Sequence, residues 1–153
     1  MIKLLKGFAY AGRGILLCLK ERNFRIHLVA VAVVVYFGAR FYEFERSEWA
    51  VLALTMGAVI SLEAVNTALE YLCDKVCTEN DALIGKCKDC AAGAVLLSAI
   101  AAVGVAVSLF WDTGRFSAIW EYFCGNIAAA IALISAVLIA VGVVFIPEYM
   151  KKK

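Results

Sequence analysis

The chain has 153 residues, of which 64% are hydrophobic, and its mean hydropathy is +0.86. A soluble domain is usually about 45–50% apolar, so this composition indicates a membrane protein, and the length favours a single domain. The formal net charge of +2 is too small to indicate a nucleic-acid partner.

The first 27 residues predict an amphipathic surface helix. Basic residues are interspersed with apolar residues that recur at helical spacing, namely Ile2, Leu5, Phe8, Ala9, Gly12, Ile15, Leu16 and Leu19. This pattern is typical of a helix that lies in the membrane interface. A simple anchor on anionic lipid has the same periodicity, so the function of the segment stays open.

Four apolar runs follow, at about residues 28–44, from Trp49 into the sixties, at 90–111 and at 119–146. A spanning helix needs about 20 residues, with a range of roughly 17–25. The sequence therefore predicts an all-α membrane protein with four transmembrane helices, the last of which ends at Pro147. We expect no cleaved signal peptide, because the basic N-terminus is not followed by a short apolar run and a small-residue cleavage site.

The basic residues predict the orientation of these spans. With four spans, residues 1–27, the 74–89 connection and the C-terminal tail lie on one side, and they hold twelve lysines and arginines. The other side holds three, which are Arg40, Arg46 and Arg115. Because basic residues concentrate on the cytoplasmic side, both termini and the 74–89 connection are expected to be cytoplasmic.

The second span continues into a polar stretch, SLEAVNTALEYLCDK, at residues 61–75. On an α-helix Glu63, Asn66, Glu70 and Asp74 fall within roughly 60° of each other and form a stripe about 16 Å long. A carboxylate in the hydrocarbon region costs at least ~2.5 kcal/mol, so Glu63, the deepest, needs a partner or a chemical role. Two plainer interpretations remain: the helix leaves the membrane near Glu70, or the stripe forms structural hydrogen bonds.

The stripe and the start of the next helix together suggest phosphoryl transfer. A carboxylate and an amide one turn apart can hold a hydroxyl and accept its proton, and a shallower carboxylate suits Mg²⁺ beside phosphates. Lys88 can neutralise phosphate and Asp89 can orient a ligand, as such a reaction requires. The chain contains neither a Walker A loop nor a kinase glycine loop, which excludes the known soluble kinase folds.

The six cysteines are Cys18, Cys73, Cys77, Cys87, Cys90 and Cys124. The four between residues 73 and 90 form pairs spaced by four and three residues, so a zinc site is one interpretation. We favour the plainer one, in which they are small apolar fillers with reduced thiols.

Three segments, KERNFRIHL, EAVNTALEYLCDK and KCKDCAAGAVLL, closely resemble the bacterial integral-membrane diacylglycerol kinase family over about residues 3–110. KERNFRIH and KDCAAGAVL look most like its Gram-positive branch, the undecaprenol kinases. The resemblance implies a homotrimer of three-span subunits with a surface helix and with sites shared between neighbouring chains. It also implies transfer of the γ-phosphate of MgATP to a membrane lipid alcohol, with undecaprenol favoured over diacylglycerol.

The resemblance also assigns roles to individual residues. Glu63 matches the catalytic base that activates the lipid hydroxyl, and Glu21 and Glu70 match the metal-binding glutamates. Asn66 is expected to contact the lipid substrate and to line the phosphate site. The remaining residues expected at the ATP site, beside Glu21 and Glu70, are Lys3, Tyr10, Asp74, Glu79, Asp81, Lys88 and Asp89.

The chain departs from the family pattern in three places. The spacing from Gly14 to Glu21 is one residue shorter, and residues 79–81 lack the usual aromatic and histidine. The family core ends with the third span, whereas this chain adds a fourth. We therefore divide it into a surface helix (1–27), a three-span core (28–111) and an added helix with a basic tail (112–153). The apolar run of the added helix, IAAAIALISAVLIAVGVVFI, contains small residues and no ionisable ones, which predicts packing or anchoring with no catalytic role.

Two other classes of function remain open. A small proton-coupled, multidrug-type exporter could use Glu63 as its proton and cation site, but it would have no use for Glu70, Lys88 and Asp89 at one mouth. A purely structural membrane protein would tolerate Glu63→Gln. His27 is expected to form an interfacial hydrogen bond and takes no chemical role.

Overall fold

The computed structural model describes the backbone of residues 2–77 and 81–151. Within these ranges it is entirely helical, with α1 (Ile2–Cys18), α2 (Arg22–Phe41), α3 (Arg46–Val76), α4 (Ala82–Phe110), α5 (Thr113–Gly125) and α6 (Ile127–Lys151). Four stretches are long and apolar enough to cross a membrane: all of α2, α3 and α4, and residues Ile127–Phe145 of α6. The predicted all-α class with four spans is confirmed.

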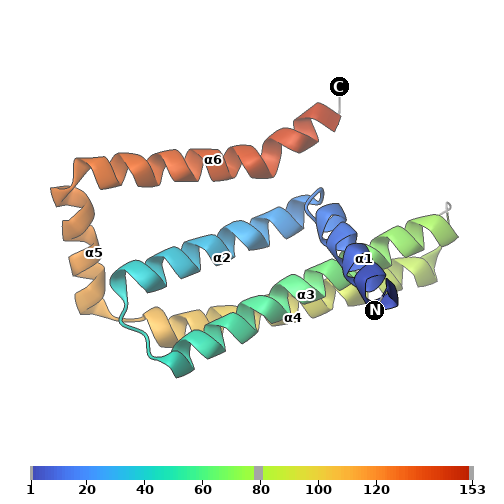
Figure 1. Cartoon of the computed structure of the whole chain (residues 1–153), viewed down its shortest axis with the longest axis horizontal. Helices are drawn as coiled ribbons and strands as arrows, with labels where there is room; N and C mark the ends of the chain where they lie inside the picture. The colour runs from blue at the N-terminus through green and yellow to red at the C-terminus, as the bar shows by residue number, and fades with distance from the viewer. Residues whose placement is uncertain (1, 78–80, 152–153) are drawn as a thin grey trace.

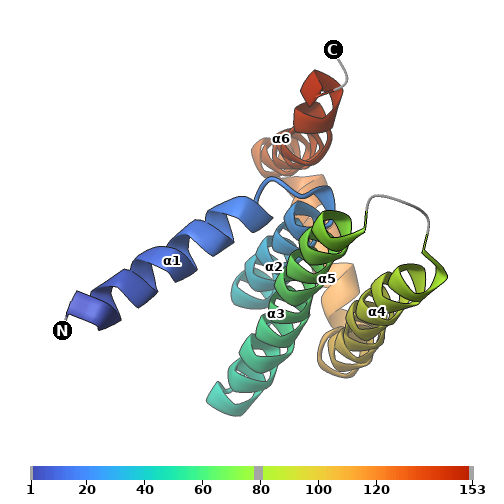
Figure 2. The ribbon, with the colours of Figure 1, turned by 90° about the vertical axis from the view of Figure 1, so that its right-hand side faces the viewer.

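The long helices lie roughly along one direction (Figure 1). The antiparallel pair α3 and α4 packs most extensively, α2 packs on α3, and α6 lies beyond α2. α5 crosses at one end and joins α4 to α6, while α1 runs crosswise at the other end (Figures 1 and 2). That other end also holds the end of α3, the start of α4 and the end of α6, so the basic segments gather there.

Side-chain caps explain where several helices begin. The Asp81 carboxylate accepts hydrogen bonds from the backbone N–H groups of Leu83 and Ile84 at the start of α4. Asp112 caps α5 in the same way, and Asn126 accepts from the N–H of Ala129 at the start of α6. These caps satisfy N–H groups that have no partner within their own helix. α3 begins with a reciprocal capping box between Glu45 and Glu48.

Several helix boundaries differ from those predicted. The surface helix ends at Cys18 instead of residue 27, and the first span begins at Arg22 instead of 28, because the chain turns at residues 19–21. The predicted fourth span at 119–146 is two helices, since the chain breaks at Asn126 and its side chain caps α6. The third span begins earlier, at Ala82.

The sequence predicted that the last helix ends at Pro147, but α6 continues to Lys151. α6 bends towards its C-terminal end instead (Figure 1). Proline has no N–H for the carbonyl four residues earlier, here that of Val143, and this loss bends helices.

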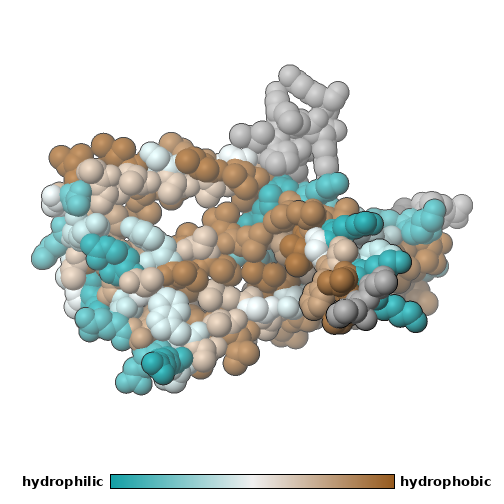
Figure 3. Space-filling view, viewed as in Figure 1, coloured by the Kyte–Doolittle hydropathy of each residue, from teal (hydrophilic) through white to brown (hydrophobic). Residues whose placement is uncertain are grey.

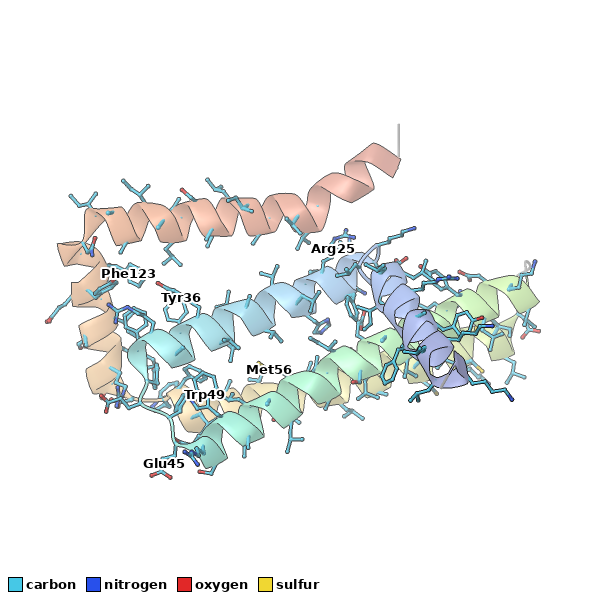
Figure 4. The ribbon with its side chains drawn as sticks, viewed as in Figure 1. Arg25, Tyr36, Glu45, Trp49, Met56 and Phe123 are labelled. Carbon is cyan, nitrogen blue, oxygen red and sulfur yellow. The ribbon has the colours of Figure 1, made fainter. Side chains whose placement is uncertain are left out.

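α6 is attached to the rest of the chain at both of its ends. At one end Arg25 of α2 donates a hydrogen bond to the Val144 carbonyl at 2.8 Å, and it lies between the start of α2 and α6 in Figure 4. At the other end Phe41 packs against Tyr122 and Phe123 of α5, which leads into α6. Between these contacts α2 and α6 line an apolar cavity of about 890 Å³, visible as a hollow in Figure 3.

Candidate functional site

The described side chains are distributed as in a membrane protein. Hydrophobic residues cover much of the outside of the helices (Figure 3). Leu54, for example, is 76% exposed. The most buried group includes polar residues of α3, since Glu63, Asn66 and Thr67 are only 3%, 5% and 3% exposed. Buried polar groups are costly unless they are paired, so this cluster marks a candidate site.

The polar stripe lies on one uninterrupted helix, α3, as the spacing predicted. The Asn66 amide donates to the Glu70 carboxylate, with 2.9 Å between Nδ2 and Oε1. The carbonyl oxygen of Asn66 is buried and has no hydrogen-bond partner. Since buried polar atoms in proteins are nearly always paired, this oxygen is available to a donor from a bound molecule.

Glu63 lies one turn deeper on the same helix. It is close enough to Glu70 and to His27 of α2 for electrostatic interaction. His27 itself bonds to the backbone carbonyl of Asn23 through Nδ1, at 2.9 Å. Glu63 is thus a buried carboxylate that has an acidic group and an imidazole within electrostatic range.

Glu21 comes to this region from the connection between α1 and α2. It precedes α2 with an extended backbone, and its side chain does not cap the helix. Its Oε1 accepts a hydrogen bond from the Tyr71 hydroxyl of α3 at 2.6 Å, although 50 residues separate the two in sequence. Tyr71 also lies within electrostatic range of Glu70, so one side chain of α3 interacts with both predicted metal carboxylates.

This pair of carboxylates fits Mg²⁺ bound together with a nucleotide. Mg²⁺ is commonly held by one or two carboxylates plus substrate phosphates, with water completing the shell. In the described part of the chain, no three His, Cys, Asp or Glu side chains gather as an all-protein metal site. The cysteine pairs therefore form no such cluster there. Burial raises the pKa of the Cys18 thiol, which makes it a poor nucleophile at neutral pH.

Lys88 and Asp74 form an ion pair between α4 and α3. Lys88 also lies within electrostatic range of Glu70. The next residue, Asp89, is exposed on α4. The contacts thus join the stripe on α3 to Lys88, which places a cation near Asp74 and Glu70.

The other predicted nucleotide residues in the described part of the chain lie on α1 and at the start of α4. Lys3 and Tyr10 are exposed on α1, where the Arg13 guanidinium lies 5.7 Å from the centre of the Tyr10 ring. The Asp81 carboxylate caps α4. Glu79 lies outside the described residues.

Two contacts at this site were not predicted from the sequence. Tyr71 contacts Glu21, and Thr67 and Tyr71 line a cavity of about 470 Å³ between α1 and α3. Arg25 donates to the carbonyls of Leu19 and Lys20 at 3.1 and 2.6 Å, and so supports the connection that carries Glu21. The only sequence signal for Tyr71 was its place directly after Glu70.

The similarity to known proteins covers the part of the chain that carries most of these site residues. The family model for prokaryotic diacylglycerol kinase matches residues 9–110. An undecaprenol kinase of Bacillus subtilis (strain 168) is 35% identical over 109 residues, which cover 71% of this chain and 88% of that protein. A diacylglycerol kinase of Synechocystis sp. is 47% identical over 103 residues, covering 65% of this chain and 58% of that protein. No solved structure matches the chain significantly.

Proposed function

The chain belongs to the prokaryotic diacylglycerol kinase family, a family of lipid kinases, and on that premise we propose how its own residues carry out the reaction. ATP would donate its γ-phosphate to the hydroxyl of a membrane lipid alcohol. The observation that carries the proposal is the buried polar face of α3, where Glu63 and the unpaired Asn66 oxygen lie together.

Glu63 is the proposed general base. It takes the proton of the lipid hydroxyl while the hydroxyl oxygen attacks the γ-phosphorus, and the bond from that phosphorus to the bridging oxygen of ADP breaks. Asn66 would orient the hydroxyl by donating to its oxygen from one N–H of its side-chain amide, while the other N–H remains on Glu70. A positioned base of this kind contributes roughly 10²–10⁴-fold to the rate.

Glu21 and Glu70 are the proposed ligands of Mg²⁺, and Lys88 is the proposed phosphate cation. The bound ion would supply positive charge to the phosphate oxygens, as in other phosphoryl transfers. The Lys88 ammonium can exchange the Asp74 carboxylate for a phosphate, since both groups are anionic hydrogen-bond acceptors. Asp74, Asp81, Asp89, Lys3 and Tyr10 remain proposed contacts of the nucleotide.

We propose undecaprenol as the acceptor, on the strength of KERNFRIH and KDCAAGAVL. The two relatives carry different acceptors in their names, so the test supplies both lipids. We further propose a homotrimer with sites shared between neighbours, and cytoplasmic termini. The gathering of the basic segments at one end of the helices supports this orientation (Figure 1).

The test is transfer of labelled γ-phosphate in membranes that contain the protein, Mg²⁺ and either undecaprenol or diacylglycerol. We expect label in the undecaprenol arm and a loss of roughly 10²–10⁴-fold in Glu63→Gln. The matched control is Glu43→Gln, which removes an exposed carboxylate between α2 and α3 and should leave the rate unchanged. Label in diacylglycerol alone would reassign the acceptor. Folded protein that labels neither lipid but carries protons across vesicles would support the exporter.

A further inference from the structure

Tyr71 of α3 forms a hydrogen bond with the carboxylate of Glu21, which lies in the turn between α1 and α2. The hydroxyl of Tyr71 donates to Oε1 of Glu21 at 2.6 Å. This distance lies in the range of about 2.5–2.7 Å that is usual for a hydroxyl bound to an ionised carboxylate. Tyr71 is 46% exposed and belongs to neither the polar stripe nor the buried polar cluster, so nothing in the proposed reaction has assigned it a role.

Glu21 needs such support because of where it lies in the chain. It occupies the short turn between α1 and α2, where the backbone is extended and its side chain forms no cap. A long side chain on a turn has several rotamers of similar energy, and fixing one of them costs entropy. The Tyr71 hydroxyl is attached to the rigid helix α3, one residue after Glu70, and it favours the rotamer that directs Glu21 towards that helix.

We infer that Tyr71 is a positioning residue that sets the Glu21 carboxylate for metal binding. The inference rests on the proposed function, in which Glu21 and Glu70 hold Mg²⁺. Tyr71 binds one oxygen of Glu21 and lies within electrostatic range of Glu70, so its hydroxyl holds the Glu21 carboxylate beside the part of α3 that carries Glu70. Hydrogen-bond partners of metal ligands typically change metal affinity or activity by about 10–100-fold when they are removed.

A purely structural role for the same bond makes a different prediction. The bond also ties the α1–α2 turn to α3, and if that were its only effect, its loss would lower thermal stability without changing metal affinity. The two roles separate when the metal dependence and the stability are measured on the same protein.

The experiment compares Tyr71→Phe with the wild-type chain. This change removes only the hydroxyl, and Tyr36→Phe is the matched control because Tyr36 lines the apolar cavity between α2 and α6. Two readouts are needed: the Mg²⁺ concentration for half-maximal lipid phosphorylation at saturating ATP, and Mn²⁺ binding by electron paramagnetic resonance with a non-hydrolysable ATP analogue. We expect Tyr71→Phe to weaken both by roughly 10-fold or more. The rate at saturating Mg²⁺ and the unfolding temperature should stay near those of the wild type.

Glu21→Gln separates failure of this inference from failure of the proposed function. If Glu21→Gln weakens Mn²⁺ binding and Tyr71→Phe does not, the positioning role of Tyr71 is wrong while the metal site stands. If Glu21→Gln leaves Mn²⁺ binding unchanged, the metal site itself is wrong and the inference falls with it. In the Glu21→Gln background, Tyr71→Phe should add little, because two residues that act through one interaction are not additive.

Discussion

Arg25→Met should detach α6 from the start of α2 and destabilise the fold. Arg25 is 6% exposed, and its guanidinium donates to the carbonyls of Leu19, Lys20 and Val144 at 3.1, 2.6 and 2.8 Å. Methionine keeps most of the length and packing of the side chain but removes all three hydrogen bonds. The variant also leaves no buried charge behind, so the loss reports on the bonds themselves.

The expected loss is about 2–4 kcal/mol. Hydrogen bonds from a charged donor contribute about 1.5–3 kcal/mol each, which sets an upper limit of roughly 5–9 kcal/mol for three of them. Removing a buried guanidinium also recovers part of its desolvation cost, which is several kcal/mol for an ion inside a protein. Nε of Arg25 is buried without a partner, which adds to that cost in the wild type and reduces the net loss.

The measurement is unfolding of the purified protein in detergent micelles, followed by circular dichroism during an SDS titration. Arg40→Met is the matched control, because Arg40 is exposed and its guanidinium lies 4.5 Å from the centre of the Tyr122 ring. An exposed cation–π contact contributes only about 0.5–1 kcal/mol. If Arg25→Met were no more destabilising than Arg40→Met, the attachment of α6 through Arg25 would be refuted.

Two further changes test the end of the site at which α4 begins. Lys88→Ala should lower the affinity for MgATP by about 10-fold or more in a nucleotide titration, because one charge-assisted hydrogen bond to phosphate contributes about 1.5–3 kcal/mol. Unchanged affinity would show that Lys88 does not contact the nucleotide. Asp81→Ala should cost about 1 kcal/mol of stability through loss of the α4 cap, whereas Asp81→Ser should retain it. Equal loss of ATP binding in both Asp81 variants, with the Ser variant stable, would show that the carboxylate contacts the nucleotide as well as the helix.

The spans and the polar stripe follow from the sequence because both are local properties. The length of an apolar run decides whether it can cross the bilayer, and the backbone of such a run must satisfy its hydrogen bonds as a helix. The spacing of Glu63, Asn66, Glu70 and Asp74 then places them on one face whatever the helix packs against. The prediction missed the break at Asn126, although the segment before it is less apolar than the segment after it and ends in the turn-forming pair Gly125-Asn126. The Asn126 cap marks where α6 begins.

The partners of these residues depend on how the helices pack. Glu21 meets Tyr71 only because α1 and α2 turn at residues 19–21 against the side of α3. Arg25 reaches Val144 across 119 residues because α5 returns the chain to lie beside α2. Hydropathy and helical period describe each helix separately. They hold no information on the rotation and offset of one helix against another. This packing geometry decides which polar side chains come into contact in a membrane.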